Sequence, residues 1–214
     1  MTIKKLALAV LVATSAFAAS ADEGKMGFAQ LNIGTALSTT SGNANIKSAG
    51  TSYFPGIEAG VNVNEYFRAG LSFSYMPKFS VKYKNLPTGV SMPNAKMTTA
   101  SILANAYIHA GDFSGFKPYI VLGAGVAKNK VGSYTATKTS GSTVTKASGS
   151  SSKTGFAYRA GLGTQYAING DFDLDVRYQY EDLGKAKVLN TNLTGFDTVK
   201  IRANEFLVGI AYKF

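Results

Sequence analysis

The ionisable residues that could act together chemically stand at alternate positions of short alternating segments. Four carboxylates and three guanidinium groups belong to this set: Glu58, Arg68, Arg159, Asp173, Asp175, Arg177 and Glu205. Two neighbouring carboxylates can act as general acid and base, but that chemistry needs a cleft that admits a substrate. Charges of both signs on one face of an alternating pattern form ion pairs more simply. We therefore interpret the seven residues as a structural polar network.

Residue types that commonly catalyse reactions or hold metals are scarce. The chain has one histidine, His109, and no cysteine, which excludes a thiolate site and a histidine-rich metal site. His109 is followed by Ala110 and Gly111, so it lacks the serine of the His-x-Ser pair that is typical of lipid A deacylases. No phosphate loop, dinucleotide fingerprint or Ser/His/Asp order is present. We expect no catalytic residue, no metal and no cofactor.

The segment 154–180 shows which elements must position the charges. Aromatic and aliphatic residues alternate with charges, amides and glycines on both sides of a turn that contains Asn169-Gly170. Period-two alternation across an Asn-Gly turn predicts a β-hairpin. Strands of about ten residues with this contrast between faces are typical of a transmembrane β-barrel.

The same pattern repeats along the chain and predicts eight strands. The first five cover about residues 27–37, 53–63, 66–76, 96–110 and 116–127; the hairpin within 154–180 supplies two more; the last ends at Phe214. Four long connections, 38–52, 77–95, 128–153 and 181–199, alternate with short turns. The third has the β propensity to extend its flanking strands as a polar hairpin. We predict an all-β, eight-stranded antiparallel up-and-down transmembrane barrel.

Alternation alone leaves open which face points outward, because a soluble calyx would turn its apolar face inward around a lipophile. Large aromatics near strand ends on the apolar face suggest an interfacial girdle: Tyr53, Tyr75, Phe156, Phe172, Tyr180, Tyr212 and Phe214. The opposite face combines charges of both signs with glycines that suit a crowded interior. Each Arg or Lys facing lipid would cost about 2–4 kcal/mol near the midplane. We therefore expect the apolar face outside.

The first residues predict export. Lys4 and Lys5 precede an apolar run from Leu6 to Ala19 that is too short for a membrane-spanning helix, and small residues follow. We expect a signal peptide at 1–21 and a barrel domain at 22–214. Both termini of an even-stranded barrel lie on one side, here predicted to be periplasmic, with the long loops exposed on the cell surface.

Lysines without nearby acids mark the second and third long connections. The candidate ligand-contact residues are Lys78, Lys82, Lys84, Lys128, Lys130, Lys138, Lys146 and Lys153. The fourth connection is expected to be balanced, with Glu181, Asp182 and Asp197 against its lysines. A basic crown could bind an anionic host glycan or an acidic host-cell receptor, or it could neutralise lipopolysaccharide phosphates or only solubilise the loops. No nucleic-acid partner is expected.

Several stretches resemble the opacity-protein-like outer-membrane β-barrel family. These are Phe116–Tyr119 running into Gly123–Gly125, Phe156–Tyr158, Gly161–Gly163, Val176–Tyr180 and the closing strand Asn204–Phe214. The terminal Phe214 with Tyr212 resembles the signal that the outer-membrane assembly machinery reads. The layout, a small barrel with no further domain, is similar to the surface adhesins of rickettsia-type bacteria.

Together the residues and the resemblance imply an outer-membrane surface barrel that acts as a host-cell adhesin and surface antigen. The alternative is a structural outer-membrane barrel with no dedicated ligand. A lipid-acting enzyme and a soluble lipophile carrier are less consistent with the residues.

Overall fold

A computed structural model describes residues 26–41, 46–47, 50–83, 86–140, 143–190, 193 and 195–214. The expected signal peptide, residues 1–21, and the candidate Lys84 lie outside the described residues, and only the backbone of Lys78 and Lys82 is described. Among the described residues no helix is long and apolar enough to cross a membrane.

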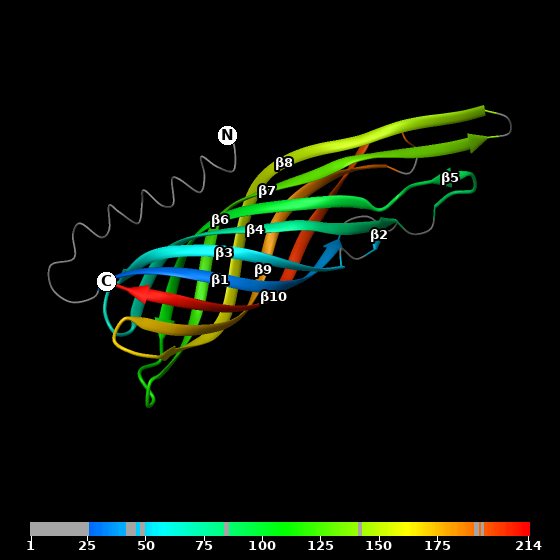
Figure 1. Ribbon diagram of the computed structural model, residues 1–214. Coiled ribbons are helices and arrows are strands. Elements are labelled where there is room, and N and C mark those ends of the chain that lie inside the picture. Colours follow the sequence, from blue (N-terminus) through cyan, green and yellow to red (C-terminus); the bar gives the residue numbers. More distant parts are fainter. Residues whose placement is uncertain are drawn as a thin grey trace.

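The described chain is built from eight long strands and two strands of two residues (Figure 1). Their bounds are β1 Gly27–Ser41, β2 Ile46–Lys47, β3 Gly50–Asn62, β4 Phe67–Tyr83, β5 Val90–Ser91, β6 Ala95–His109, β7 Phe116–Ser140, β8 Thr143–Ala167, β9 Phe172–Leu189 and β10 Phe196–Lys213. Each long strand pairs antiparallel with the next, and β1 pairs with β10 from Phe28↔Lys213 to Ser41↔Lys200. The predicted eight-stranded antiparallel barrel is confirmed.

Three tight turns close one end, which we call the short-turn end, and each is fixed by an Asx side chain. Asn64 accepts hydrogen bonds from the backbone N–H groups of Tyr66 and Phe67. Asn169 does the same for Asp171 and Phe172, and Asp112 accepts from Gly115. Asn and Asp favour such turns because their side chains satisfy nearby backbone donors. β10 ends at the same side of the barrel (Figure 1).

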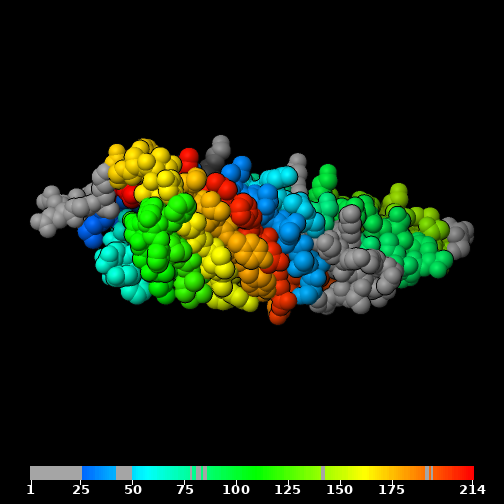
Figure 2. All heavy atoms as spheres, turned by 90° about the horizontal axis from the view of Figure 1, so that it is seen from below, coloured from blue at the N-terminus to red at the C-terminus, as the bar shows by residue number. Residues whose placement is uncertain are grey.

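The apolar face points outward, as expected for a membrane barrel. Leu31 and Leu162 are 70% and 62% exposed, while Arg177 between them in the barrel wall is 1% exposed. The strands run obliquely over the surface of an elongated body (Figure 2). Aromatic side chains lie near the ends of this apolar band, with Phe172 against Tyr212 at one end and Tyr158 against Tyr180 at the other. A calyx with an apolar interior at this level is excluded by the buried charges.

The strands run well past their predicted ends at the opposite side, which we call the extended end. β7 and β8 are 25 residues each, so the polar-hairpin expectation is confirmed. The predicted connections 77–95 and 181–199 are largely wrong, because β4 continues to Tyr83, β9 continues to Leu189 and β10 begins at Phe196.

Towards the extended end, the polar and apolar faces of the strands exchange sides. There the inward positions are apolar and form one cluster: Ala36, Phe54, Met76, Phe79, Ala95, Met97, Ala127, Val131, Ala157, Leu183, Ala186, Val188, Val199, Ile201, Ala203 and Leu207. Along β10, outward residues change from Ile210 and Phe206 to the half-exposed Arg202 and the exposed Lys200. Beyond the apolar band the sheet thus resembles a soluble protein, with an apolar interior and a charged exterior.

Candidate functional site: charged interior and basic extended end

Arg177 of β9 is the centre of the polar interior near the middle of the barrel. Its guanidinium forms ion pairs with Glu58 at 3.5 Å and Asp175 at 3.4 Å. It also donates to the Tyr107 hydroxyl at 2.9 Å, and this hydroxyl donates to Glu58. All four side chains are buried. The two carboxylates therefore share the Arg177 guanidinium, and the Tyr107 hydroxyl links this guanidinium to Glu58.

Arg68 of β4 occupies the neighbouring part of the interior. It donates to Gln30 at 2.7 Å, and its guanidinium carbon lies 3.4 Å from the centre of the Phe28 ring. A cation over an aromatic face is stabilised most when water is excluded, as it is here. Arg68 thus gains an aromatic and an amide partner in place of a direct carboxylate.

A second ion-pair group lies nearer the extended end. Arg159 of β8 pairs with Glu181 at 2.9 Å, and Gln179 donates to Glu205 at 2.6 Å. Glu181 was expected to be a loop charge, and this expectation is wrong. β9 continues past Tyr180 and keeps Glu181 on the inward face, where it is fully buried.

Asp173 and His109 lie towards the short-turn end. Asp173 accepts from Lys213 at 2.7 Å, and His109 lies inside the barrel 3.1 Å from the Gln165 side-chain oxygen. Side chains fill the interior at these levels; an added Cβ at Gly163 would approach the Tyr119 hydroxyl to 2.5 Å. The seven candidate residues are all buried inside the barrel, and their partners are other charged side chains, amides, phenols and the Phe28 ring.

Several members of this interior were not in the predicted network, among them Gln30, Tyr107, Tyr119, Gln179 and Glu181. Tyr119 donates to Asp175 at 2.7 Å and Tyr107 joins Arg177 to Glu58. Tyr107 already stood on the polar side of its segment in the alternation. A tyrosine on the polar side of the alternation was the available signal.

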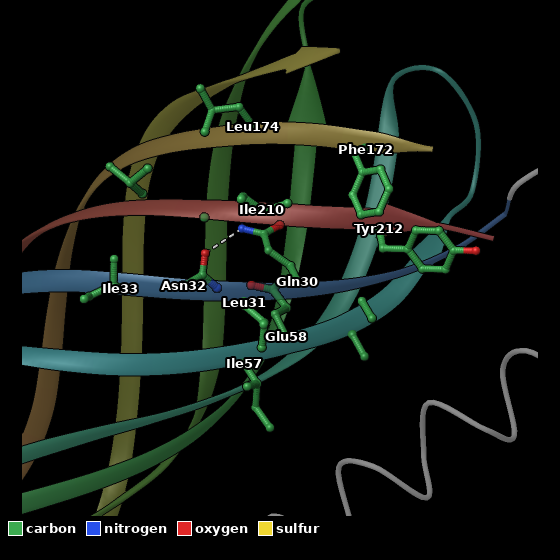
Figure 3. Close-up of a pocket in the computed structure, with 14 residues that line it drawn as sticks. Gln30, Leu31, Asn32, Ile33, Ile57, Glu58, Phe172, Leu174, Ile210 and Tyr212 are labelled. Carbon is green, nitrogen blue, oxygen red and sulfur yellow. Dashed lines mark hydrogen bonds between the residues drawn. The ribbon is translucent and has the colours of Figure 1, made fainter. Parts of the chain in front are cut away.

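The apolar band carries a groove of about 680 Å³ over β1, near the short-turn end (Figure 3). It arises because the small residues Ala29 and Ala59 stand opposite each other between larger neighbours. Leu31, Ile57 and Phe172 contribute to its rim, while the Gln30–Asn32 hydrogen bond lies in the wall behind it. The outward lining is apolar, so the groove suits an acyl chain rather than a reaction.

The extended end presents lysines. Lys128, Lys130, Lys138 and Lys146 of the β7–β8 hairpin are exposed and Lys153 is half-buried. Lys138 and Lys146 lie near the hairpin tip, where Lys138 pairs with Thr145 and Lys146 with Thr137. Lys128 lies opposite Thr154, one outward step beyond the apolar Val126 and Phe156. The candidate lysines therefore occupy two levels, a distal and a proximal one.

The fourth connection is basic on its surface rather than balanced. Exposed Lys185 stands directly opposite exposed Lys200 in the β9–β10 ladder, with Lys187 two residues further along β9. Two of the three acids expected to balance them do not face outward freely: Glu181 is inside, and buried Asp182 accepts from Arg202 and the Gly184 N–H, whereas Asp197 is half-buried in this connection. Like charges directly across a ladder are unfavourable unless an anion screens them.

The extended end also has a small core of its own. Met92, Ala136 and Leu189 are buried there with Tyr83, Leu86, Val90, Tyr134, Ala147 and Leu193 around them. The Tyr134 hydroxyl lies 2.8 Å from the Tyr83 hydroxyl and accepts from the Leu189 N–H at 2.9 Å. Burial raises the pKa of Tyr83, which keeps its hydroxyl protonated. Segments from three connections are thus joined into one ordered platform.

Changing Tyr134 to Ala should loosen this platform without unfolding the barrel. The change removes a ring that packs over Gly149 and both hydroxyl contacts, and large-to-small core changes of this kind cost about 3–5 kcal/mol. Trypsin cleavage at Lys138 and Lys146 should speed up at least about tenfold, since each 1.4 kcal/mol changes the open population tenfold. Mass spectrometry of timed digests measures this rate.

The exposed neighbour Thr135 supplies the control, because Thr135→Ala should leave the cleavage rate unchanged. Equal rates for native protein and Tyr134→Ala would contradict a platform held by this tyrosine.

The last residues complete the barrel wall. Tyr212 is outward and half exposed, its ring lies 5.9 Å from that of Phe214, and Phe214 exchanges backbone hydrogen bonds with Gly27. Both aromatic rings of the expected assembly signal therefore lie at the short-turn end.

Comparison with known proteins gives a family and relatives. The family described as outer membrane protein beta-barrel domain matches residues 6–214. Outer membrane protein PagN of Salmonella typhimurium is 31% identical over 135 residues, which is 60% of this chain and 54% of that protein. A Rickettsia conorii protein provisionally named an adhesin is 30% identical over 165 residues, 76% of this chain and 66% of that protein. The match thus spans between half and two thirds of these relatives' length.

Among solved structures, Neisserial surface protein A has a similar fold. Its TM-score is 0.52 at 23% identity, and the match covers 87% of this chain and 97% of that one. At this identity the likeness shows the fold alone.

Proposed function

We propose that this chain, which belongs to the family of outer membrane protein β-barrel domains, attaches bacteria to host cells through the basic extended end. The supporting observation is the charge of that end. Among its described residues the exposed lysines outnumber the acids, and Asp197 is the only acid there that is not buried. Two relatives named as outer membrane protein and, provisionally, adhesin are consistent with this role.

In this proposal the extended end faces the surroundings of the cell and both termini are periplasmic. Residues 1–21 direct export, and Tyr212 and Phe214 are read by the assembly machinery. The ligand is an anionic host-surface component, a glycan or an acidic receptor, because lysines without acids attract negative charge over about a Debye length. The buried ion pairs serve stability rather than catalysis.

Lysines at two distances from the apolar band allow a matched test: Lys138 and Lys146 near the hairpin tip are the distal pair, and Lys185 and Lys200 near the apolar band are the proximal pair. Non-adherent bacteria would display the native chain, Lys138→Glu/Lys146→Glu, or Lys185→Glu/Lys200→Glu, which change net charge equally. We expect native attachment to epithelial cells to fall at least about tenfold in the distal variant and at high salt, and to persist in the proximal one, because surface electrostatic attraction is screened within about 10 Å.

Surface display is checked by antibody binding before attachment is counted. Attachment that is unaffected by the distal reversals, or absent for the native chain, would reject the adhesin and favour a structural barrel with no dedicated ligand.

The Lys185–Lys200 pair favours a second role, the binding of lipopolysaccharide. These residues lie just beyond Tyr180 at the edge of the apolar band, the level of lipid phosphate groups. A phosphate between the two ammonium groups would relieve their repulsion. The proximal variant should therefore retain less lipopolysaccharide on purification, measured by phosphate content, while the distal variant retains the native amount.

A further inference from the structure

In the described part of the chain, the β8 side of the β7–β8 hairpin has no paired strand near the hairpin tip. β8 pairs with β7 up to Ser140↔Thr143, but its ladder with β9 begins only at Tyr158↔Asp182. Among the described residues, β7 is therefore the only strand that pairs with β8 from Thr143 to Ser150, which we call the open edge.

The open edge lies beyond the part of β8 that pairs with β9, whose ladder with β8 stops at Asp182. Gly184 adopts a φ of +75°, which suits glycine, and the inward positions change parity there. β9 then approaches β7: Asn129 of β7 donates to the Leu183 carbonyl at 2.8 Å, and Leu189 donates to Tyr134. Ser151 marks the limit of the open edge, since its hydroxyl donates to the Lys187 carbonyl.

An open edge presents the N–H and C=O of every second residue as a template for a further strand. The open edge is roughly 27 Å long at 3.4 Å per residue, contains no proline and consists of Thr, Val, Ser, Ala, Gly and one Lys. The platform core under Tyr134 and Ala147 holds it in place. It is thus ordered in advance for pairing.

The charge of the open edge determines which kind of molecule is suited to bind there. Lys146 lies on the edge, Lys138 lies across the ladder and Lys153 follows, whereas the open edge contains no acid. A second copy would place lysines against lysines, which is unfavourable. A sulfated glycan would neutralise the lysine charges, but it has no peptide N–H and C=O groups with which to form a β-ladder. An extended acidic polypeptide satisfies both features.

We propose that the open edge of β8 binds an extended acidic segment of a partner protein by strand addition. This inference rests on the proposed attachment function and names its ligand class. Main-chain hydrogen bonds would hold the segment, and its carboxylates would pair with Lys138, Lys146 and Lys153.

Peptides with methylated amides test the inference on the unaltered protein. The probe is a fluorescent octapeptide of alternating Thr and Glu, titrated against the folded full chain in detergent. One derivative carries N-methyl groups on the Thr amides and the other on the Glu amides. In strand addition only one set of amides faces β8, so one derivative should bind at least about tenfold more weakly and the other within about threefold of the parent.

Equal binding by both derivatives, or no binding by the parent peptide, would overturn the inference. A Thr–Lys peptide is the charge control and should not bind.

Proline variants provide the same test from the protein side. Ala147 and Ser148 are adjacent, so one directs its N–H to β7 and the other to the open edge. Proline at the edge-facing position should abolish peptide binding while the trypsin cleavage rate of the hairpin stays native. Native binding by both proline variants would contradict strand addition.

A result that rejects strand addition can be distinguished from one that rejects the attachment function. If a sulfated oligosaccharide binds the native chain and Lys138→Glu/Lys146→Glu abolishes attachment, but the Thr–Glu peptide does not bind, the adhesin stands and strand addition is rejected.

Discussion

Replacing Arg177 by Met should lower the free energy of unfolding by about 3–5 kcal/mol, because it leaves two buried carboxylates without their cation. Glu58 and Asp175 both pair with this guanidinium, and Tyr107 loses the donor that fixes its hydroxyl. The chain contains no tryptophan, so the midpoint of thermal or urea unfolding is followed by circular dichroism, supported by the heat-dependent gel shift of folded barrels.

Two further variants isolate the cause. Arg202→Met removes a half-exposed guanidinium paired with Asp182 and should cost no more than about 1 kcal/mol. Adding Glu58→Gln and Asp175→Asn to Arg177→Met should restore part of the lost stability, because neutral amides need no counter-charge. A triple variant less stable than Arg177→Met, or equal costs for the two arginines, would argue against a charge-balanced centre.

Placing an arginine at Leu162 should destabilise the folded barrel in lipid by about 2–4 kcal/mol. Leu162 is outward in the middle of the apolar band, between the aromatic residues at its two ends, so the new charge would lie in hydrocarbon. Urea titration of the chain folded into lipid vesicles measures the change.

Val144 gives the control for this prediction. It is 55% exposed, close to the 62% of Leu162, but it lies near the hairpin tip beyond the apolar band. Val144→Arg should change the free energy of unfolding by no more than about 0.5 kcal/mol, as for an ordinary surface position. Similar costs at both positions would mean that the hydrocarbon level has been placed wrongly.

The reversal of side-chain polarity along the strands links these results to function. In the apolar band the outside is hydrocarbon and the inside charged; at the extended end the outside is charged and the inside apolar. The barrel wall can therefore continue beyond the band as an ordered platform, stabilised by ordinary apolar burial. Ordered strands hold Lys138 and Lys146 at fixed positions, which suits specific attachment better than a mobile loop would.

The sequence by itself determined the barrel and the direction of its faces. Alternation in 154–180, repeated over eight segments, implied the strand number, and the charges of Glu58, Arg159 and Arg177 implied a polar interior, because lipid does not tolerate them. The Asn-containing turn at Asn169 was also visible, since its chemistry is local.

Only the tertiary structure decided where the strands end and which charges meet. Glu181 and Lys185 are four residues apart and looked alike as loop charges, yet one pairs inside with Arg159 and the other faces outward opposite Lys200. The glycine at 184, with its positive φ, changes the inward parity between them, and the burial of Leu183, Ala186 and Val188 against other strands keeps the chain extended. Such packing depends on contacts between strands far apart in the sequence, which alternation within one strand does not encode.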